Sequence, residues 1–552
     1  MKKIELSILN GKKITITKGD SLLSVREELQ KNNTFPVLAA KVDNSIVSLN
    51  YIPDNDAIIE PVTFLSKEGK EVYRITVAFV LYMAANELYD NSRLVIRHSF
   101  GGGSYYDYYT DIPVNQEIID SLSDKMREII ELDLPLNEKT ISKKSAITYF
   151  KKRAQSEKVR LIENSNIKKL TIHEGKNFSN IGLYPLAPST GFISQFKLKT
   201  YYPGFILQLP EKENFKCYPK TGYYPKLFKI FRESKIWGKI LNVSNVGRLN
   251  QVINNNGTSE LIKIAESLHE KKIAQIADEI TKRKEDVRLV LISGPSAAGK
   301  TTFSKRLSIN LRVNGIRPIA ISMDNYFVDR EKCPKDENGE YDFEAVEAIN
   351  IKLFNEHLSM FLEGEDVGVP KFDFESGKSI PNFKQVRLED DQILIVEGIH
   401  GLNGRLTSSI PEKNKMKIYI SALTQLSIDD HNRIPTTDTR ILRRMIRDKK
   451  YRNYTASETL SRFKSVIKGE EKHIFPFQES ADIMFNSSLV YELALLKSFA
   501  VPILSEIEKT DKTYTEAQRL LRFLEFFKPV PASEIPPTSI LREFIGGSSF
   551  KY

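Results

Sequence analysis

Cysteine, tryptophan and long apolar runs are scarce in this sequence of 552 residues. Its two cysteines, Cys217 and Cys333, are too few for a disulfide framework or a cysteine-rich zinc site. No apolar run approaches the ~18 residues of a membrane-spanning helix, and the first residues lack the apolar core of a signal peptide. We therefore expect a cytoplasmic protein of a reducing compartment, with no membrane partner.

Length and charge limit the number of domains and the kinds of ligand that we expect. The length predicts about three or four domains. Lys and Arg number 81 against 71 Asp and Glu, a net charge of +10. This mild excess suits a protein that binds phosphorylated ligands, but it also suits weak contact with RNA, and the charge does not separate the two.

A glycine-rich loop, Gly294–Thr301, has the pattern G-x-x-x-x-G-K-T. The continuous apolar segment Leu289–Ile292 before it is typical of a buried strand. After it, apolar residues recur every four positions from Phe303 to Leu311 and predict a helix. Phosphate binding needs this order of elements, because glycines admit a close approach and N–H groups at the helix start point at the anion. The sequence therefore predicts a nucleoside triphosphate site.

The residue types of this loop predict particular roles. The Lys300 ammonium group can reach the outer phosphates, and the Thr301 hydroxyl can ligate Mg²⁺. We expect ATP and Mg²⁺ as cofactors. The other residues expected to contact the nucleotide are Gly294, Ser296, Ala297, Ala298, Gly299 and Thr302.

Two acidic residues follow two further apolar segments. Ile319–Met323 precedes Asp324, and Ile393–Val396 precedes Glu397. In open α/β sheets, ligands bind beyond the carboxyl ends of the strands. A carboxylate there can accept the proton of an attacking hydroxyl and help to hold Mg²⁺. We expect Asp324 to be the base and both acids to be metal ligands; surface charge or helix capping is the alternative.

Four arginines, Arg440, Arg443, Arg444 and Arg447, lie three and four positions apart. This spacing places them on one face of a helix. Like charges repel unless acids or phosphates neutralise them, and guanidinium groups fit phosphate oxygens well. The pattern favours a lid that closes over phosphates, with a solvated helix face as the alternative.

Together these segments resemble the uridine kinase/phosphoribulokinase family over residues 286–500. The resemblance implies a kinase with a parallel sheet that transfers the γ-phosphate of ATP to the 5′-hydroxyl of a ribonucleoside, uridine or cytidine first. It implies that Asp342 holds ribose hydroxyls and that Arg444 and Arg447 contact the nucleotide. The residues that it assigns to the substrate are Tyr326, Asp342, Phe372, Arg440 and Arg443.

The acceptor segment departs from uridine kinases. In that family a Tyr-Asp-Phe segment followed by a His contacts the base, whereas this chain has Phe372-Asp373-Phe374 and no His soon after. The identity of the base therefore stays open. Transfer to another sugar hydroxyl, as in phosphoribulokinase, is the alternative within enzymes.

The first 212 residues carry a second resemblance. In residues 1–64, Ile4, Leu6 and Ile8 alternate, as do Ile14 and Ile16, and a helix and further strands are expected after them. This β-grasp order resembles the TGS domain of threonyl-tRNA synthetases. Residues 65–212 are similar to the editing domain of those synthetases through Gly102–Tyr108 and Pro188–Phe192.

The editing chemistry is not expected here. The positions that carry the metal-binding and editing side chains in those synthetases hold Ile75, Phe79, about Gly182 and Leu186, none of which can ligate a metal. The resemblance thus implies a scaffold without editing activity. Contact with tRNA or RNA remains an expected partnership, and an RNA-associated ATP-binding switch is the alternative to an enzyme.

Two helical parts complete the expected α/β architecture. Residues 213–285 are expected to be a connecting region that ends in a long helix from Ser259. Its aromatic residues either stack on RNA or pack in a helical subdomain. Residues 501–552 are expected to be a C-terminal extension with a helix over Tyr514–Phe527. The sequence leaves the oligomeric state open.

Overall fold

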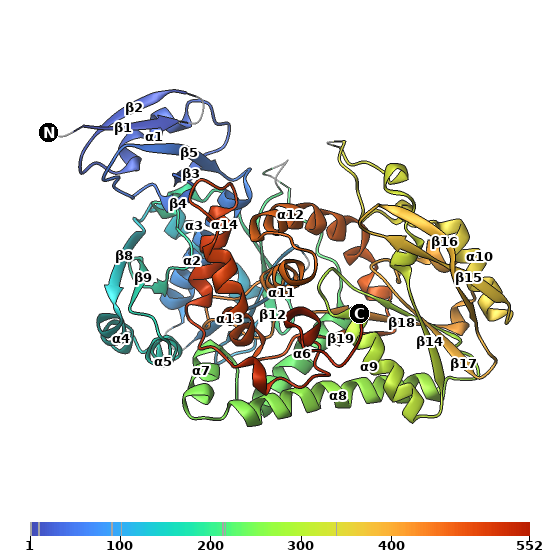
Figure 1. The fold of residues 1–552 in the computed structure, drawn as a ribbon. Coiled ribbons are helices and arrows are strands. Elements are labelled where there is room, and N and C mark those ends of the chain that lie inside the picture. The colour runs from blue at the N-terminus through green and yellow to red at the C-terminus, as the bar shows by residue number, and fades with distance from the viewer. Residues whose placement is uncertain are drawn as a thin grey trace.

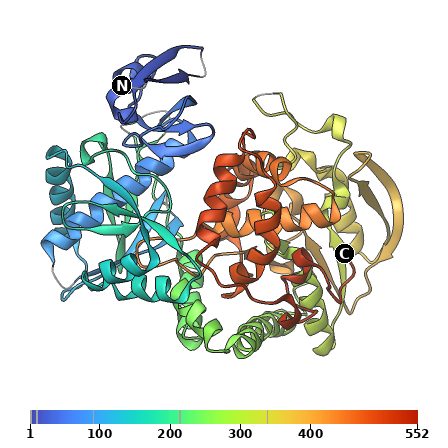
Figure 2. The same ribbon diagram turned by 60° about the vertical axis from the view of Figure 1, so that its left-hand side comes forward.

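The computed structural model describes residues 3–8, 11–89, 92–100, 102–211, 215, 217–337 and 339–552. Figure 1 shows a small sheet domain at the N-terminal end, a parallel sheet at the opposite side, and the long helix α8 (Thr258–Lys282) along the lower edge. The C-terminal helices, red in Figure 2, lie between the N-terminal half and the parallel sheet. The mixed α/β class is as predicted.

The N-terminal sheet has the strand order β2-β1-β5-β3-β4. Strand β1 pairs with β5 in parallel and with β2 antiparallel. The alternation expected from the sequence is observed, since Ile4, Leu6 and Ile8 are buried against Leu22 and Leu29. The bounds are β1 Lys3–Ile8, β2 Lys13–Thr17, η1 Leu22–Val25, α1 Arg26–Gln30, β3 Val37–Val42, β4 Ser45–Ser48 and β5 Ala57–Thr63.

The next region is built around helix α2 (Lys67–Leu88), which is buried along most of its length. The Ser66 side chain accepts a hydrogen bond from the Gly69 N–H and caps its start. Two sheets flank it, in the orders β11-β12-β7-β6 and β10-β9-β8. The bounds are β6 Arg93–Phe100, β7 Gly103–Tyr109, α3 Gln116–Glu131, β8 Asn137–Ser142, α4 Lys143–Lys151, α5 Ser156–Asn164, β9 Lys169–Glu174, β10 Ser179–Ile181, η2 Thr190–Phe192, β11 Lys197–Tyr201 and β12 Gly204–Gln208.

Helices connect the two halves. Besides α8 they are α6 (Pro225–Ile240) and α7 (Val246–Asn254). On α6, Phe228 and Phe231 pack with Phe100 in one apolar cluster. These two rings therefore serve packing rather than the RNA-stacking alternative.

The C-terminal half contains a five-stranded sheet in the order β14-β17-β13-β18-β19, and every pairing in it is parallel. Apolar clusters cover both faces, which explains why its strands read as continuous apolar runs. The bounds are β13 Leu289–Ser293, α9 Lys300–Val313, β14 Arg317–Ser322, α10 Ile351–Leu362, β17 Gln392–Glu397, β18 Lys415–Ser421 and β19 Ile483–Asn486, with a separate hairpin of β15 Asp366–Asp373 and β16 Lys378–Arg387.

The C-terminal helices pack back onto the start of the chain. Helix α14 ends at Leu524, before the predicted Phe527. Its Thr515 hydroxyl donates to the Asn44 carbonyl, and Glu516 pairs with Lys67 at 3.0 Å. No helix of the described residues has the length and apolar character needed to cross a membrane. The bounds are α11 Thr436–Tyr451, α12 Ala456–His473, α13 Glu492–Ser505, α14 Tyr514–Leu524 and α15 Arg542–Ile545.

Candidate active site

The glycine-rich loop joins β13 to α9 at the carboxyl edge of the parallel sheet. A Cβ at Gly294 would overlap the carbonyl oxygen of Ile420 on the neighbouring strand, so this position needs glycine. Gly299, with φ of +85°, has a left-handed conformation immediately before the helix. The loop thereby reaches its phosphate-binding shape through local backbone geometry.

The sheet brings the predicted catalytic residues to this edge. Asp324 lies two residues after β14 ends, and Glu397 ends β17, where it pairs in register with Ile292 of β13. The Thr301 hydroxyl lies 3.4 Å from the Glu397 carboxylate. The Lys300 ammonium group donates to the carbonyls of Gly294 and Pro295 at 2.9 and 3.3 Å.

Two partly buried carboxylates share this edge. Burial raises the pKa of Asp324, and the Lys300 ammonium opposes that rise. Burial and then the nearby Asp324 raise the pKa of Glu397, again against Lys300. A divalent cation would relieve the repulsion between the two acids, and a hydroxyl with two carboxylates is the oxygen donor set that Mg²⁺ prefers. The residues present therefore fit Mg²⁺ bound together with phosphate.

Comparison with known proteins agrees with this geometry. Residues 289–493 match the Phosphoribulokinase / Uridine kinase family. We call this part of the chain the kinase-family domain after that match.

The N-terminal region has different relatives. It is similar to the threonine–tRNA ligases of Desulforamulus reducens and Coxiella burnetii, at 29% identity over 196 residues and 28% over 194 residues. Each match covers 35% of this chain, and 31% and 30% of the respective ligase. The chain thus spans about a third of the length of the curated relatives that it matches.

Two solved kinase structures also match. One is a putative fructose transport system kinase from Silicibacter, with 17% identity, a TM-score of 0.28, and coverage of 39% of this chain and 98% of that one. The other is a possible uridine kinase from Bacillus stearothermophilus, with 21% identity, a TM-score of 0.22, and coverage of 26% and 78%.

The arginine helix α11 of the kinase-family domain differs from the expected open lid. Arg440 and Arg443 are fully buried and form ion pairs with Glu470 and Glu492. Buried guanidinium groups need such carboxylate partners. Both arginines also donate to loop carbonyls, those of Ser296 and Ala297 respectively. The solvated-face alternative is wrong for these two residues, and they brace the loop from α11 instead of projecting toward a substrate.

The other two arginines are only partly buried. Arg444 donates to the Ser296 hydroxyl at 3.0 Å, which places it beside the phosphate loop. Arg444 and Arg447 share Asp448 as an ion-pair partner, each at 3.2 Å. Their contact with nucleotide phosphates stays a prediction.

Loop N–H groups of the kinase-family domain are held by carboxylates that the sequence did not reveal. Glu470 accepts from the Ser296 N–H at 2.8 Å. The Glu543 carboxylate accepts from the Thr302 N–H at 3.2 Å and from the Thr302 hydroxyl at 2.6 Å. The Tyr552 hydroxyl lies 2.9 Å from the Thr302 hydroxyl oxygen. Such N–H groups are the donors that a phosphate loop offers to phosphate oxygens. The C-terminal extension therefore occupies part of the nucleotide's expected place.

A second polar cluster lies near the loop. Asp342 is 3.4 Å from the His473 imidazole. The Oε2 atoms of Glu344 and Glu470 are buried without a hydrogen-bond partner among the described residues. Burial, and then Glu470, raises the pKa of Glu344 to about 7. Burial, and then His473, lowers the pKa of His400 to about 4. Acceptors without donors suit a ligand rich in hydroxyl groups.

Two residues expected to contact the substrate lie in the core instead. Tyr326 is buried, and its hydroxyl lies 3.1 Å from the His357 imidazole. Phe372 is buried against Phe327 in the same cluster. The alternation of a strand would place Phe372 and Phe374 on one face, and it does not show that β15 ends between them at Asp373. Phe374, which is 60% exposed, is the ring of this segment that faces solvent.

The positions of the synthetase metal ligands are packed with apolar groups. Phe79 contacts Phe178 edge to face, and Leu186 belongs to the same core. A Cβ at Gly182 would crowd the ring of His173. The absence of zinc and of editing activity stays a prediction.

Proposed function

We propose that this chain is an ATP-dependent kinase that phosphorylates the 5′-hydroxyl of a ribonucleoside, with uridine or cytidine as the first candidates. The observation that supports this most is the grouping of Lys300, Thr301, Asp324 and Glu397 at the carboxyl edge of one parallel sheet. The family match over residues 289–493 supports phosphoryl transfer to a sugar or nucleoside in general.

Each of these groups has a task in the proposed reaction. Asp324 accepts the proton of the attacking hydroxyl, and its raised pKa makes it a better base than a solvated aspartate. Lys300 leaves the loop carbonyls and stabilises the negative charge of the transferred phosphoryl group. Mg²⁺, held by Thr301, Asp324 and Glu397, would neutralise charge on the outer phosphates.

The polar cluster around Asp342 supports a hydroxyl-rich acceptor. Asp342, Glu344 and Glu470 offer carboxylate oxygens, and two of these oxygens have no hydrogen-bond partner in the part of the chain that the structure describes. A sugar lacking its hydroxyls would leave these buried acceptors unpaired, which costs affinity. Because Phe372 is buried, we do not count its ring among the groups that contact the base. We infer strict selection for ribose and loose or altered selection for the base.

A nucleoside panel tests this proposal. Purified protein with Mg²⁺ and ATP is assayed for ADP formation with uridine, cytidine, inosine, adenosine and their 2′-deoxy forms, with ribulose 5-phosphate as the sugar-phosphate arm. Asp324→Asn is the control for turnover at this site. We expect ribonucleosides to be phosphorylated and deoxyribonucleosides to be poor acceptors. Equal turnover of both, or turnover of the sugar phosphate alone, would contradict the proposal.

The N-terminal similarity to threonine–tRNA ligases favours one second candidate, an RNA-associated protein that uses ATP as a switch. Such a protein would hydrolyse ATP faster when tRNA is added and would need no small acceptor. Adding tRNA to the same assay without any nucleoside separates the two functions.

A further inference from the structure

A cavity lies between the two halves of the chain, away from the phosphate loop. Helix α2 contributes Arg74, Ile75 and Phe79, the loop before α11 contributes residues 431–435, and α14 contributes Arg519. Its volume is about 70 Å³, and one water needs roughly 10–15 Å³ by this measure. The cavity therefore has room for several waters or for one small ligand.

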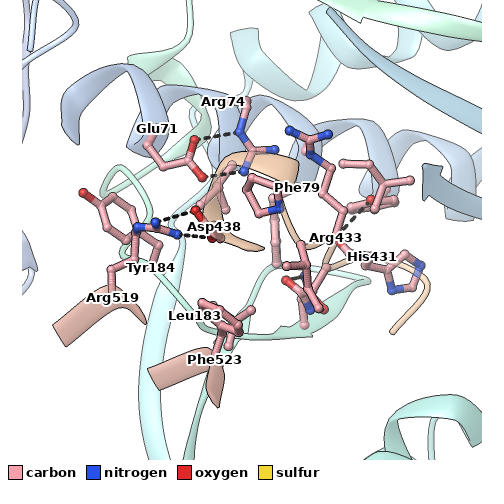
Figure 3. A pocket seen from close by; sticks show the side chains of 18 residues that line it. Glu71, Arg74, Phe79, Leu183, Tyr184, His431, Arg433, Asp438, Arg519 and Phe523 are labelled. Atoms are coloured by element: carbon pink, nitrogen blue, oxygen red, sulfur yellow. Dashed lines mark hydrogen bonds and ion pairs between the residues drawn. The ribbon is translucent and has the colours of Figure 1, made fainter. Parts of the chain in front are cut away.

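Two of the arginines that line this cavity already form ion pairs. Arg74 holds Glu71 through two hydrogen bonds of 2.6 and 2.8 Å, and Arg519 holds Asp438 through two of 2.7 Å, as Figure 3 shows. Burial alone would raise the pKa of Glu71, but Arg74 lowers it to about 2. Both carboxylates of the lining thus form ion pairs with these two arginines.

Arg433 is the third guanidinium group of the lining, and Glu71 and Asp438 attract it without forming an ion pair with it. Its Nε is buried without a hydrogen-bond partner, and it forms no ion pair within the described ranges. Burial, and then the adjacent Arg74, lowers its pKa to about 10, so it stays charged at neutral pH. Burial and then Lys158 hold the pKa of His431 well below its usual range, so that ring is neutral.

A buried donor without an acceptor is costly unless a ligand pairs with it. Arg519 is also held by Glu516 through hydrogen bonds of 2.9 and 3.0 Å, so Glu71, Asp438 and Glu516 match the three guanidinium groups in number. The feature left for a ligand is the buried Nε of Arg433. A guanidinium fork matches the paired oxygens of a carboxylate or phosphate group. We propose that this cavity binds a small oxyanion, a carboxylate or phosphate group, through Arg433.

The cavity lies at the start of helix α11. Arg433 lies three residues before α11 begins, and Asp438, which belongs to the cavity lining, is in the first turn of that helix. About one and two turns into the helix, Arg440 and Arg443 contact the phosphate loop. The occupant thus sits at the start of the helix whose first half braces the nucleotide site.

Direct binding measurements test the proposal without relying on kinase activity. Because the phosphate loop also binds phosphate, all proteins carry Lys300→Ala. Calorimetry and thermal unfolding are followed with inorganic phosphate in one arm and with acetate and glycolate in another, at constant ionic strength set by chloride. Arg433→Gln removes the proposed anchor. Arg127→Gln is the matched control, since Arg127 is 61% exposed and pairs with Asp124 on the surface of α3.

We expect saturable binding of one anion per chain that weakens at least about tenfold in Arg433→Gln and is unchanged in Arg127→Gln. Binding only of phosphate, or only of carboxylates, identifies which group the cavity takes. No saturable binding in either arm, or equal binding in Arg433→Gln, overturns the proposal. If Arg433→Gln does not fold, Arg433→Lys serves instead: it keeps the charge but loses the fork, so binding should weaken several-fold.

Discussion

Glu543 holds the group that a nucleotide phosphate would use, so its charge should oppose ATP binding. Its carboxylate accepts from the Thr302 N–H and hydroxyl at 3.2 and 2.6 Å. A phosphate oxygen that binds the same donors must displace it, and the two negative groups also repel each other. The test is Glu543→Gln, which keeps the size and one acceptor oxygen but removes the charge.

The expected magnitude follows from these two hydrogen bonds. A hydrogen bond to a charged group contributes about 1.5–3 kcal/mol and a neutral one about 0.5–1.5 kcal/mol. Neutralising Glu543 therefore weakens its hold on Thr302 by roughly 1–2 kcal/mol after allowing for its partial exposure. Since 1.4 kcal/mol is a factor of ten, the Kd of MgATP should fall by about five- to thirtyfold.

Titration calorimetry with MgATP measures the change, with Glu534→Gln as the control. Glu534 is an exposed acid of the same extension, so its replacement removes the same charge without touching the loop. The control should bind ATP as the parent chain does. An unchanged or higher Kd in Glu543→Gln would show that Glu543 supports the loop's binding shape, and the competition argument would be refuted.

Three further changes test the site itself. Asp324→Asn should lower turnover by ~10²–10⁴ with ATP affinity nearly kept; near-normal turnover, measured by ADP release, would show that Asp324 is not the base. Because the folded-state pKa of Glu344 is about 7, well above its unfolded value, its contribution to stability is complete below about pH 4.5 and lost as pH rises through 7. In denaturant titrations at several pH values, Glu344→Gln should therefore remove about 3 kcal/mol from the pH-dependent change in the free energy of unfolding. If that free energy changed with pH as steeply in the variant as in the parent chain, the raised pKa would be contradicted. Gly294→Ala should abolish ATP binding because its Cβ would overlap the Ile420 carbonyl, whereas Gly404→Ala, in open space, should not; normal calorimetry for both would disprove the steric argument.

The sequence was informative wherever chemistry follows from local pattern. The phosphate loop needs only consecutive residues, and strands that end in acids bring Asp324 and Glu397 to one edge once the sheet is parallel. The two halves were also recognisable, because their resemblances rest on contiguous segments.

What the sequence could not predict depends on distant partners. Glu470 and Glu543 reach the phosphate loop from 174 and 241 residues away, and nothing in their own neighbourhoods marks them. Helical spacing placed Arg440 and Arg443 on one face but could not show that Glu470 and Glu492 neutralise them. Burial likewise distinguishes Phe372, inside β15, from Phe374, one residue past its end, although the alternation of a strand would give both rings the same face.

The contacts of residues 509–516 with the N-terminal half bear on how the chain folds during its synthesis. Lys67 meets Glu516 across 449 residues, and Lys509 meets Asp43 across 466. At about 5–20 residues per second, a ribosome needs from roughly twenty seconds to a minute and a half to make the second partner. The N-terminal surface must stay in water for that time. Ion pairs suit such a delay, because charged groups remain hydrated and do not promote aggregation while they wait.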